Sequence, residues 1–211
     1  YRDSEAGFEY ELAEEFAEFL GVDLHVITPG WSEMIDYLNN GKGDFIAAGL
    51  TITDARKELV DFSQGYMDVQ QQIIQHRRST ELTTLENLNG LTVHIRKDTS
   101  YEERLLHLKE QGIDLEIVYH EDIPTEELIE LVSHTKIALT VADSNIAKLN
   151  RRYYPEIRTT LPISEEQSLG WAVRKEDEEL LKKINEFFDY AYAHGIYDNI
   201  YNEYYSNVHI F

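Results

Sequence analysis

Two apolar runs, one in each half of the sequence, are each followed by a polar loop and a short helical pattern. The first is DFIAAGL at residues 44–50, and the second is KIALTVAD at residues 136–143. A short apolar run bounded by a turn and by polar residues is typical of a strand buried on both faces. Such strands lie in sheets that helices cover, so the sequence predicts an α/β protein with two similarly built lobes.

Helical and alternating patterns surround these two runs. Tyr10, Ala13 and Phe16 share one helical face, and Gly21 follows as a common helix stop. The residues DLHVIT at 23–28 alternate between polar and apolar, which predicts a strand. The second half alternates in the same way between strand patterns and helix patterns, as a parallel-rich sheet requires.

Two extended segments, near residues 74–77 and 167–173, interrupt this alternation. A chain that leaves one lobe, builds another and returns needs two such crossings, so we expect a hinge of two strands. The predicted lobe 1 comprises residues 1–77 and 168–211, and the predicted lobe 2 comprises residues 78–167.

Composition excludes several classes of protein. The chain has 211 residues, of which 42% are apolar, and this is enough to form a sizeable core. Its 40 acidic and 19 basic residues give a net charge of −21, which argues against a nucleic-acid or anionic-membrane partner. There is no cysteine, so disulfides and a thiol nucleophile are excluded. No apolar run reaches the roughly 18 to 20 residues of a membrane-spanning helix.

Catalytic and metal-binding patterns are also lacking from the sequence. The eight histidines are dispersed, without the HExxH spacing of zinc enzymes. Acidic pairs lie on polar helix faces, where a solvated surface is the simpler interpretation. No GxSxG, P-loop or GxGxxG motif occurs. We therefore expect this chain to be non-catalytic and to hold no metal and no cofactor.

Several long motifs follow one another in a specific order. They include W-S-E-M-I-D-Y-L-x-x-G-K-x-D, then GLTIT-x-x-R-K-E-L-V-D-F-S-x-x-Y, and VADS in the second half. From residue 7 to residue 205 the chain resembles the periplasmic solute-binding proteins of family 3, the polar amino-acid binders. The resemblance implies a type II periplasmic-binding-protein fold, in which two α/β lobes joined by a two-strand hinge close on a small ligand. It also implies a periplasmic or extracytoplasmic location.

The resemblance assigns ligand-binding roles in lobe 1. Arg56 stands where the family's arginine forks onto the ligand α-carboxylate, and an exposed arginine that opens a helix is the alternative. Thr51 and Gly49 stand where family members offer a hydroxyl and backbone groups, and ordinary turn chemistry is the alternative. Trp31 stands where an aromatic packs against the ligand, and it equally fits the core face of a helix.

Lobe 2 carries the remaining predicted ligand-binding residues. Thr99 and Ser100 precede a helix whose N-terminal amides suit an anionic group, although a Thr or Ser N-cap serves the fold in any case. Asp143, in VADS, occupies the position whose carboxylate receives the ligand α-ammonium. Its alternative is again an N-cap.

The sequence departs from the family at two places. HTKIA at residues 134–138 replaces the family's Gly-x-x-Asp, which we interpret as a structural variation away from the pocket. The family's first strand, and the aromatic that follows it, would lie before Tyr1. We therefore expect a trimmed or mature fragment in which one wall of the pocket is incomplete.

A narrower resemblance concerns residues 1–22 and residues 141–174. They are similar to the amino-terminal module of murein lytic transglycosylase F and its relatives, in which this fold precedes a lysozyme-like catalytic domain. This implies a sensor for an amino acid or a small cell-wall peptide, fused to a transglycosylase domain and tethered to the outer membrane. The first alternative is the receptor of an amino-acid ABC transporter, with a permease as its partner. The second is an enzyme on the same fold, similar to cyclohexadienyl dehydratase.

Overall fold

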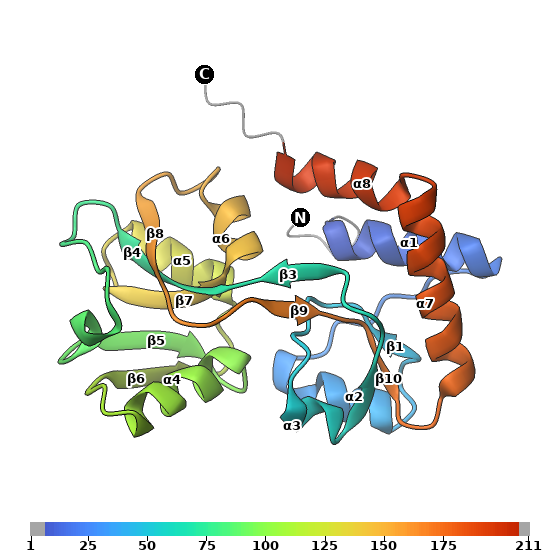
Figure 1. Ribbon diagram of the computed structural model, residues 1–211, viewed down its shortest axis with the longest axis horizontal. Helices are drawn as coiled ribbons and strands as arrows, with labels where there is room; N and C mark the ends of the chain where they lie inside the picture. Colours follow the sequence, from blue (N-terminus) through green and yellow to red (C-terminus); the bar gives the residue numbers. More distant parts are fainter. Residues whose placement is uncertain (1–6, 207–211) are drawn as a thin grey trace. The chain divides into compact units, whose positions relative to one another are not determined.

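The computed structural model describes residues 7–206 and divides the chain into two compact units (Figure 1). Unit 1 takes its residues from Tyr1–Asp68 and Ser168–Phe211, and unit 2 is Val69–Gln167. Each unit combines a sheet with helices, so the predicted α/β class is confirmed. Within residues 7–206, no helix has both the length and the apolar character that crossing a bilayer requires.

Unit 2 alternates strands with helices along the chain, as its sequence predicts. Its elements are β4 (Gln71–His76), η2 (Leu85–Leu88), β5 (Thr92–Arg96), α4 (Ser100–Glu110), β6 (Glu116–His120), α5 (Thr125–Ser133), β7 (Leu139–Asp143), α6 (Ser144–Asn150) and β8 (Ile157–Pro162). Five of them form one sheet in the order β6-β5-β7-β4-β8. β5 is parallel to β6 and β7, whereas β4 is antiparallel to β7 and β8.

Both faces of the unit 2 sheet are covered by helices. Ile73 and Val141 belong to the core cluster of α4, which includes Leu105. Ile74 and Ala142, one residue further along each strand, belong to the cluster of α5 and α6 on the opposite face (Figure 1). Because side chains alternate along a strand, a strand that is covered on both faces buries successive residues on opposite sides. This explains why all five residues of β7 are buried.

Unit 1 is assembled from both ends of the chain. Its elements are α1 (Phe8–Leu20), η1 (Trp31–Glu33), α2 (Met34–Asn39), β1 (Phe45–Ile46), α3 (Asp54–Lys57), β2 (Val60–Phe62), β10 (Ala172–Arg174), α7 (Glu178–Ala193), α8 (Ile196–Tyr201) and η3 (Asn202–Ser206). The three strands form an antiparallel sheet in the order β1-β10-β2. Gly21 ends α1 with φ 71°, the left-handed conformation that glycine adopts without strain, as predicted.

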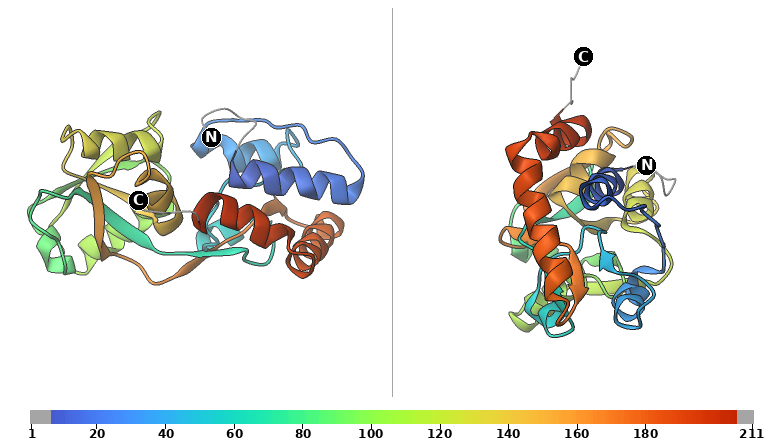
Figure 2. Two further views of the ribbon diagram at one scale, coloured as in Figure 1. Left: turned by 90° about the horizontal axis from the view of Figure 1, so that it is seen from above. Right: turned by 90° about the vertical axis from the view of Figure 1, so that its right-hand side faces the viewer.

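An aromatic cluster packs α1 and α7 onto one face of this small sheet. Trp171 is fully buried at its centre. Its ring lies 4.9 to 6.1 Å, between centroids, from four others: Phe16, Phe45, Phe187 and Phe188. Pairs at such separations contribute about 0.5–1.5 kcal/mol each beyond their area burial. The cluster therefore joins α1 to α7, and α8, which follows α7, runs beside α1 in Figure 2.

The first boundary between the units lies earlier than the sequence placed it. The predicted boundary followed residue 77, and the predicted crossing covered residues 74–77. Most of that crossing instead belongs to β4, which is hydrogen-bonded to β7 and to β8 and is therefore part of the unit 2 sheet. The segments that cross are β3 (Met67–Val69) and β9 (Gln167–Leu169), and these two strands pair with each other.

The prediction of a strand at residues 23–28 is wrong. This segment has no regular secondary structure, and the side chains of Val26 and Ile27 are 48% and 56% exposed. An alternating pattern becomes a strand only when another strand supplies hydrogen bonds. β1 pairs with β10 along one edge, and the part of the chain that the structure describes supplies no strand for its other edge.

Two adjacent leucines of α4 provide a test of this packing. Leu105 is fully buried, whereas Leu106 is 42% exposed. We expect Leu105→Ala to lower the free energy of unfolding by about 2–5 kcal/mol, because it leaves a cavity in the core. The control Leu106→Ala should change it by about 0.5 kcal/mol or less. Urea unfolding followed by circular dichroism measures both, and equal losses would contradict the orientation of α4.

Candidate functional site

Three of the residues predicted for lobe 1 come together on unit 1. The Nη1 of Arg56 donates a hydrogen bond to the carbonyl oxygen of Thr51 at 2.8 Å. The guanidinium carbon of Arg56 also lies 5.9 Å from the ring centroid of Trp31, within the range of a cation–π contact. A carbonyl and an aromatic ring thus both restrain the orientation of the guanidinium.

The loop between β1 and α3 fixes these groups. Thr53 is the N-cap of α3, and its Oγ1 accepts a hydrogen bond from the backbone N–H of Arg56 at 3.2 Å. Thr51 is almost fully buried and forms an antiparallel bridge with Leu169. Gly49 has φ 68°, a conformation that costs other residues strain. Arg56 is consequently partly buried, unlike the exposed helix arginine of the alternative interpretation.

Glu9 of α1 supports the same loop through hydrogen bonds. Glu9 accepts hydrogen bonds from Nε1 of Trp171 at 2.9 Å, from the hydroxyl of Tyr66 and from the backbone N–H of Gly49. Burial raises the pKa of Glu9, and the three hydrogen bonds oppose this rise. Burial and the charge of Glu9 raise the pKa of Tyr66 well above its ordinary value of 10, so the tyrosine stays protonated.

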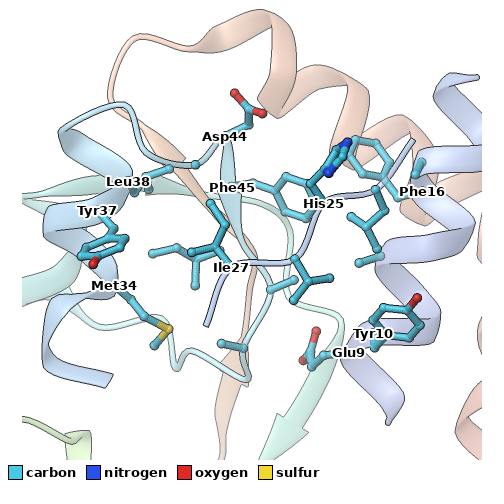
Figure 3. A pocket seen from close by; sticks show the side chains of 18 of the residues that line it. Glu9, Tyr10, Phe16, His25, Ile27, Met34, Tyr37, Leu38, Asp44 and Phe45 are labelled. Atoms are coloured by element: carbon cyan, nitrogen blue, oxygen red, sulfur yellow. The ribbon is translucent and has the colours of Figure 1, made fainter. Parts of the chain in front are cut away.

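A cavity of about 730 Å³ lies beside Glu9 on unit 1 (Figure 3). Its walls come from α1, α2, β1 and residues 22–27, and they include Phe16, Met34 and Phe45. The four residues predicted for lobe 1 are not among those that line it. The cavity is therefore separate from the predicted amino-acid site.

The residues predicted for lobe 2 lie at one edge of the unit 2 sheet. Asp143 ends β7, while Thr99 and Ser100 follow β5 and begin α4. Because β5 and β7 are parallel, their carboxyl ends meet at the same edge, where α/β sheets commonly bind ligands. The backbone N–H of Asp143 donates to the hydroxyl of Tyr101 at 2.9 Å. Burial, and then the charge of Asp143, raise the pKa of Tyr101 well above 10.

Helix capping does not account for Thr99 and Asp143. Each occupies an N-cap position, of α4 and of α6, but neither side chain accepts a hydrogen bond from its helix. The Oγ1 of Thr99 instead donates to the carbonyl of Arg96 at 2.8 Å. Asp98, just before it, has φ 59°, and its N–H donates to Glu102 at 3.0 Å. Asp tolerates this left-handed conformation better than most residues do.

The structure adds Gln71 to this edge of the sheet. It is the first residue of β4, it is almost fully buried, and its Nε2 lies 3.3 Å from the Oγ of Ser100. Its backbone N–H donates to the Oγ of Ser164 at 3.0 Å. The motifs of the sequence do not point to Gln71. The one signal is a run of glutamines, residues 70–72, directly before Ile73 and Ile74.

Metal ligation finds little support in the described residues. Within residues 7–206, no group of three or more His, Cys, Asp or Glu residues is arranged to hold a metal ion. His94 of β5 and His120 of β6 form a pair with ring nitrogens 3.0 Å apart. Burial and the neighbouring imidazole lower the pKa of His94. This pair offers fewer ligands than the three protein ligands typical of a catalytic zinc.

The whole chain matches a known family. Residues 1–207 fit the model of the bacterial extracellular solute-binding proteins, family 3, which confirms the resemblance seen in the motifs. The chain is 51% identical over 211 residues to the membrane-bound lytic murein transglycosylase F of Desulfosudis oleivorans. That alignment covers 100% of this chain and 46% of the relative, so the chain spans less than half of the relative's length.

Solved structures resemble the fold closely. An ancestral arginine-binding protein bound to arginine has a TM-score of 0.87 and 26% identity, with 97% of this chain and 91% of that chain covered. An ancestral amino acid-binding protein described as a precursor of cyclohexadienyl dehydratase has a TM-score of 0.85 and 27% identity, with 97% and 88% covered. These neighbours are type II periplasmic binding proteins, which confirms the predicted fold type.

The environment of Glu9 predicts that stability falls as pH rises. A carboxyl whose pKa is higher in the folded than in the unfolded state stabilises the fold fully only below its unfolded pKa, near 4.5. This contribution is lost as pH rises through the higher, folded-state pKa. We expect the free energy of unfolding to decrease over this window, and Glu9→Gln to flatten the decrease, when urea unfolding is followed as a function of pH.

Two features of α1 sharpen this measurement. Glu11 and Glu15 are more exposed, but their pKa values are also raised, chiefly by burial, so the comparison with the variant isolates the share of Glu9. Glu14→Gln removes an exposed carboxylate whose charge helps to raise the pKa of Glu11 and Glu15, and it should flatten the decrease less than Glu9→Gln does. An equally steep slope in Glu9→Gln would assign the pH dependence to other groups.

Proposed function

We propose, because this chain belongs to the bacterial extracellular solute-binding proteins of family 3, that it captures an amino acid or a small cell-wall peptide. The observation that carries this proposal is the restrained guanidinium of Arg56. The carbonyl of Thr51 and the ring of Trp31 hold it in place, and an oriented guanidinium binds a carboxylate through two parallel hydrogen bonds. A lysine would not reproduce this geometry.

Unit 2 supplies the complementary charge in this proposal. Asp143 is 5% exposed, and its carboxylate suits the α-ammonium of the same ligand. Thr99 and Ser100 stand at the start of α4, where the helix dipole favours an anionic group of the ligand. Gly49 offers its backbone carbonyl on unit 1, because its N–H is bonded to Glu9. One cationic and one anionic partner match an amphoteric ligand, although the protein as a whole carries a net charge of −21.

The larger role in this proposal is that of a sensor. It is supported by the 51% identity to a membrane-bound lytic murein transglycosylase F, of which the chain covers 46%. We place the module in a protein that also carries a lytic transglycosylase domain, with the module reporting ligand to that domain. Catalysis then belongs to the other domain, and the protein acts outside the cytoplasm, tethered to the outer membrane.

Two other roles share this fold and are less favoured. A receptor of an amino-acid ABC transporter binds the same class of ligand, and the neighbour that is an arginine-binding protein supports that class. The relative with 51% identity favours the sensor instead. An enzyme similar to cyclohexadienyl dehydratase is less favoured, because the neighbour described as a precursor of that enzyme is itself an amino acid-binding protein.

Arg56→Lys tests the ligand site. A thermal-shift screen with the common amino acids, arginine and glutamine first, and with peptidoglycan stem peptides identifies ligands, since a ligand at 100 times its dissociation constant stabilises the fold by ~2.7 kcal/mol. For each ligand found, we expect Arg56→Lys to weaken binding in calorimetry by roughly thirtyfold, or about 2 kcal/mol. Lys57→Ala, on the same short helix, should bind normally. Unchanged affinity in Arg56→Lys would remove Arg56 from the site.

The sensor role requires the full-length protein. We expect a saturating ligand from the screen to change the rate at which that protein cleaves glycan strands by about fivefold or more, the lower end of common allosteric couplings. In Arg56→Lys, the ligand concentration that gives half of this response should rise by the same roughly thirtyfold factor as the dissociation constant. A cleavage rate that is indifferent to a ligand that binds would reject the sensor role and leave the ligand site standing.

A further inference from the structure

Gln71 holds a buried amide oxygen that the fold does not pair. The residue is 1% exposed, and its Nε2 lies 3.3 Å from both the Oγ of Ser100 and the Oε1 of Gln167. Its Oε1 has no hydrogen-bond partner among the described residues. Buried acceptors are nearly always paired, because leaving one without a donor is costly. The oxygen of Gln71 therefore calls for a donor from outside the fold.

The position of Gln71 shows where that donor would come from. Gln71 and Asp143 are direct partners on the antiparallel strands β4 and β7. Opposite residues on such strands project to the same face, with their Cβ atoms about 5 Å apart. Here it is the face that α4 covers, since Ser100 contacts Gln71 and Tyr101 contacts Asp143. A carboxylate and an amide oxygen thus adjoin each other at the N-terminus of α4.

Gln75, on the same strand, is a glutamine whose side-chain oxygen and nitrogen are both hydrogen-bonded within the fold. It is also 1% exposed. Its Oε1 accepts hydrogen bonds from the N–H of Leu82 at 3.0 Å and from the hydroxyl of Thr160 at 3.2 Å. Its Nε2 donates to the carbonyl of Thr80 at 2.8 Å. Gln71 is equally buried without being equally paired, and this difference points to a ligand.

We propose that the Oε1 of Gln71 is a second acceptor for the ligand's ammonium, beside Asp143. An ammonium needs at least two N–H groups to bond both acceptors at once, and a primary ammonium has three. A dimethylated ammonium has one, so it can bond only one of these two acceptors. Gln71 therefore makes the site select ligands by the number of N–H groups on their nitrogen. This inference rests on the proposed function, because it assumes an amino-acid ligand bound to Asp143.

Calorimetry on the chain tests the selection. The probes are L-amino acids, beginning with L-arginine and L-glutamine, and the Nα,Nα-dimethyl derivative of each one that binds. We expect Gln71→Leu to weaken the primary amine roughly tenfold to a hundredfold, as for a lost hydrogen bond to a charged group. Its affinity for the dimethyl derivative should change little. The affinity for the primary amine, divided by the affinity for its dimethyl derivative, should therefore be smaller in this variant than in the wild type.

Two further variants separate the possible outcomes. Gln75→Leu should lower the melting temperature and keep the wild-type ratio of affinities. Asp143→Asn should weaken the primary amine, which checks the premise. If Asp143→Asn weakens binding but Gln71→Leu leaves the ratio unchanged, the inference is overturned and the proposed function stands. If Gln71→Leu alters only the melting temperature, its role is structural. If no amino acid binds, this inference fails, and if no stem peptide binds either, the proposed function fails with it.

Discussion

The carboxylate of Glu9 joins the segments on which unit 1 depends. Its three donors are Trp171 in the aromatic cluster, Tyr66 just before β3, and Gly49 in the loop that leads to Arg56. A carboxylate withdrawn from water is tolerated only when such donors replace its hydration. Each donor consequently fixes the segment that carries it. The packing of the aromatic cluster and the geometry of the arginine loop therefore both depend on the hydrogen bonds of Glu9.

Unit 2 meets a similar demand with a different architecture. Its anionic group, Asp143, stands at the carboxyl end of a buried strand, and Tyr101 from the facing helix holds its backbone N–H. Unit 1 presents its cation, Arg56, from a four-residue helix that a threonine caps. The longer helix α4 directs a dipole at its edge of the sheet, whereas the short α3 relies on hydrogen bonds alone. The two units thus present opposite charges, and each charge is held by a different local structure.

The sequence predicts elements that are marked by a local residue type or by burial on both faces. Gly21 marks the end of α1 through its own backbone conformation, and β7 is buried along its whole length because helices cover both of its faces. Residues 23–28 show the limit of such patterns, because alternation does not reveal whether a partner strand exists. Residues 74–77 show another limit, since a sheet strand and a crossing strand share one pattern. Only the pairing of β4 with β7 and β8 tells them apart.

The predicted site residues came from motif positions. The motifs did not identify the residues that support them, Glu9 and Gln71. Glu9 stands four residues before Ala13, on the apolar face of α1, and Gln71 shares the parity of Ile73 on β4. A polar residue at such a position must find its partner within the fold or in a ligand. Gln75 finds it within the fold. Once the elements are known, spacing places all three residues on core-facing positions. Only the contacts between distant segments separate a residue that stabilises the fold from one that awaits a ligand.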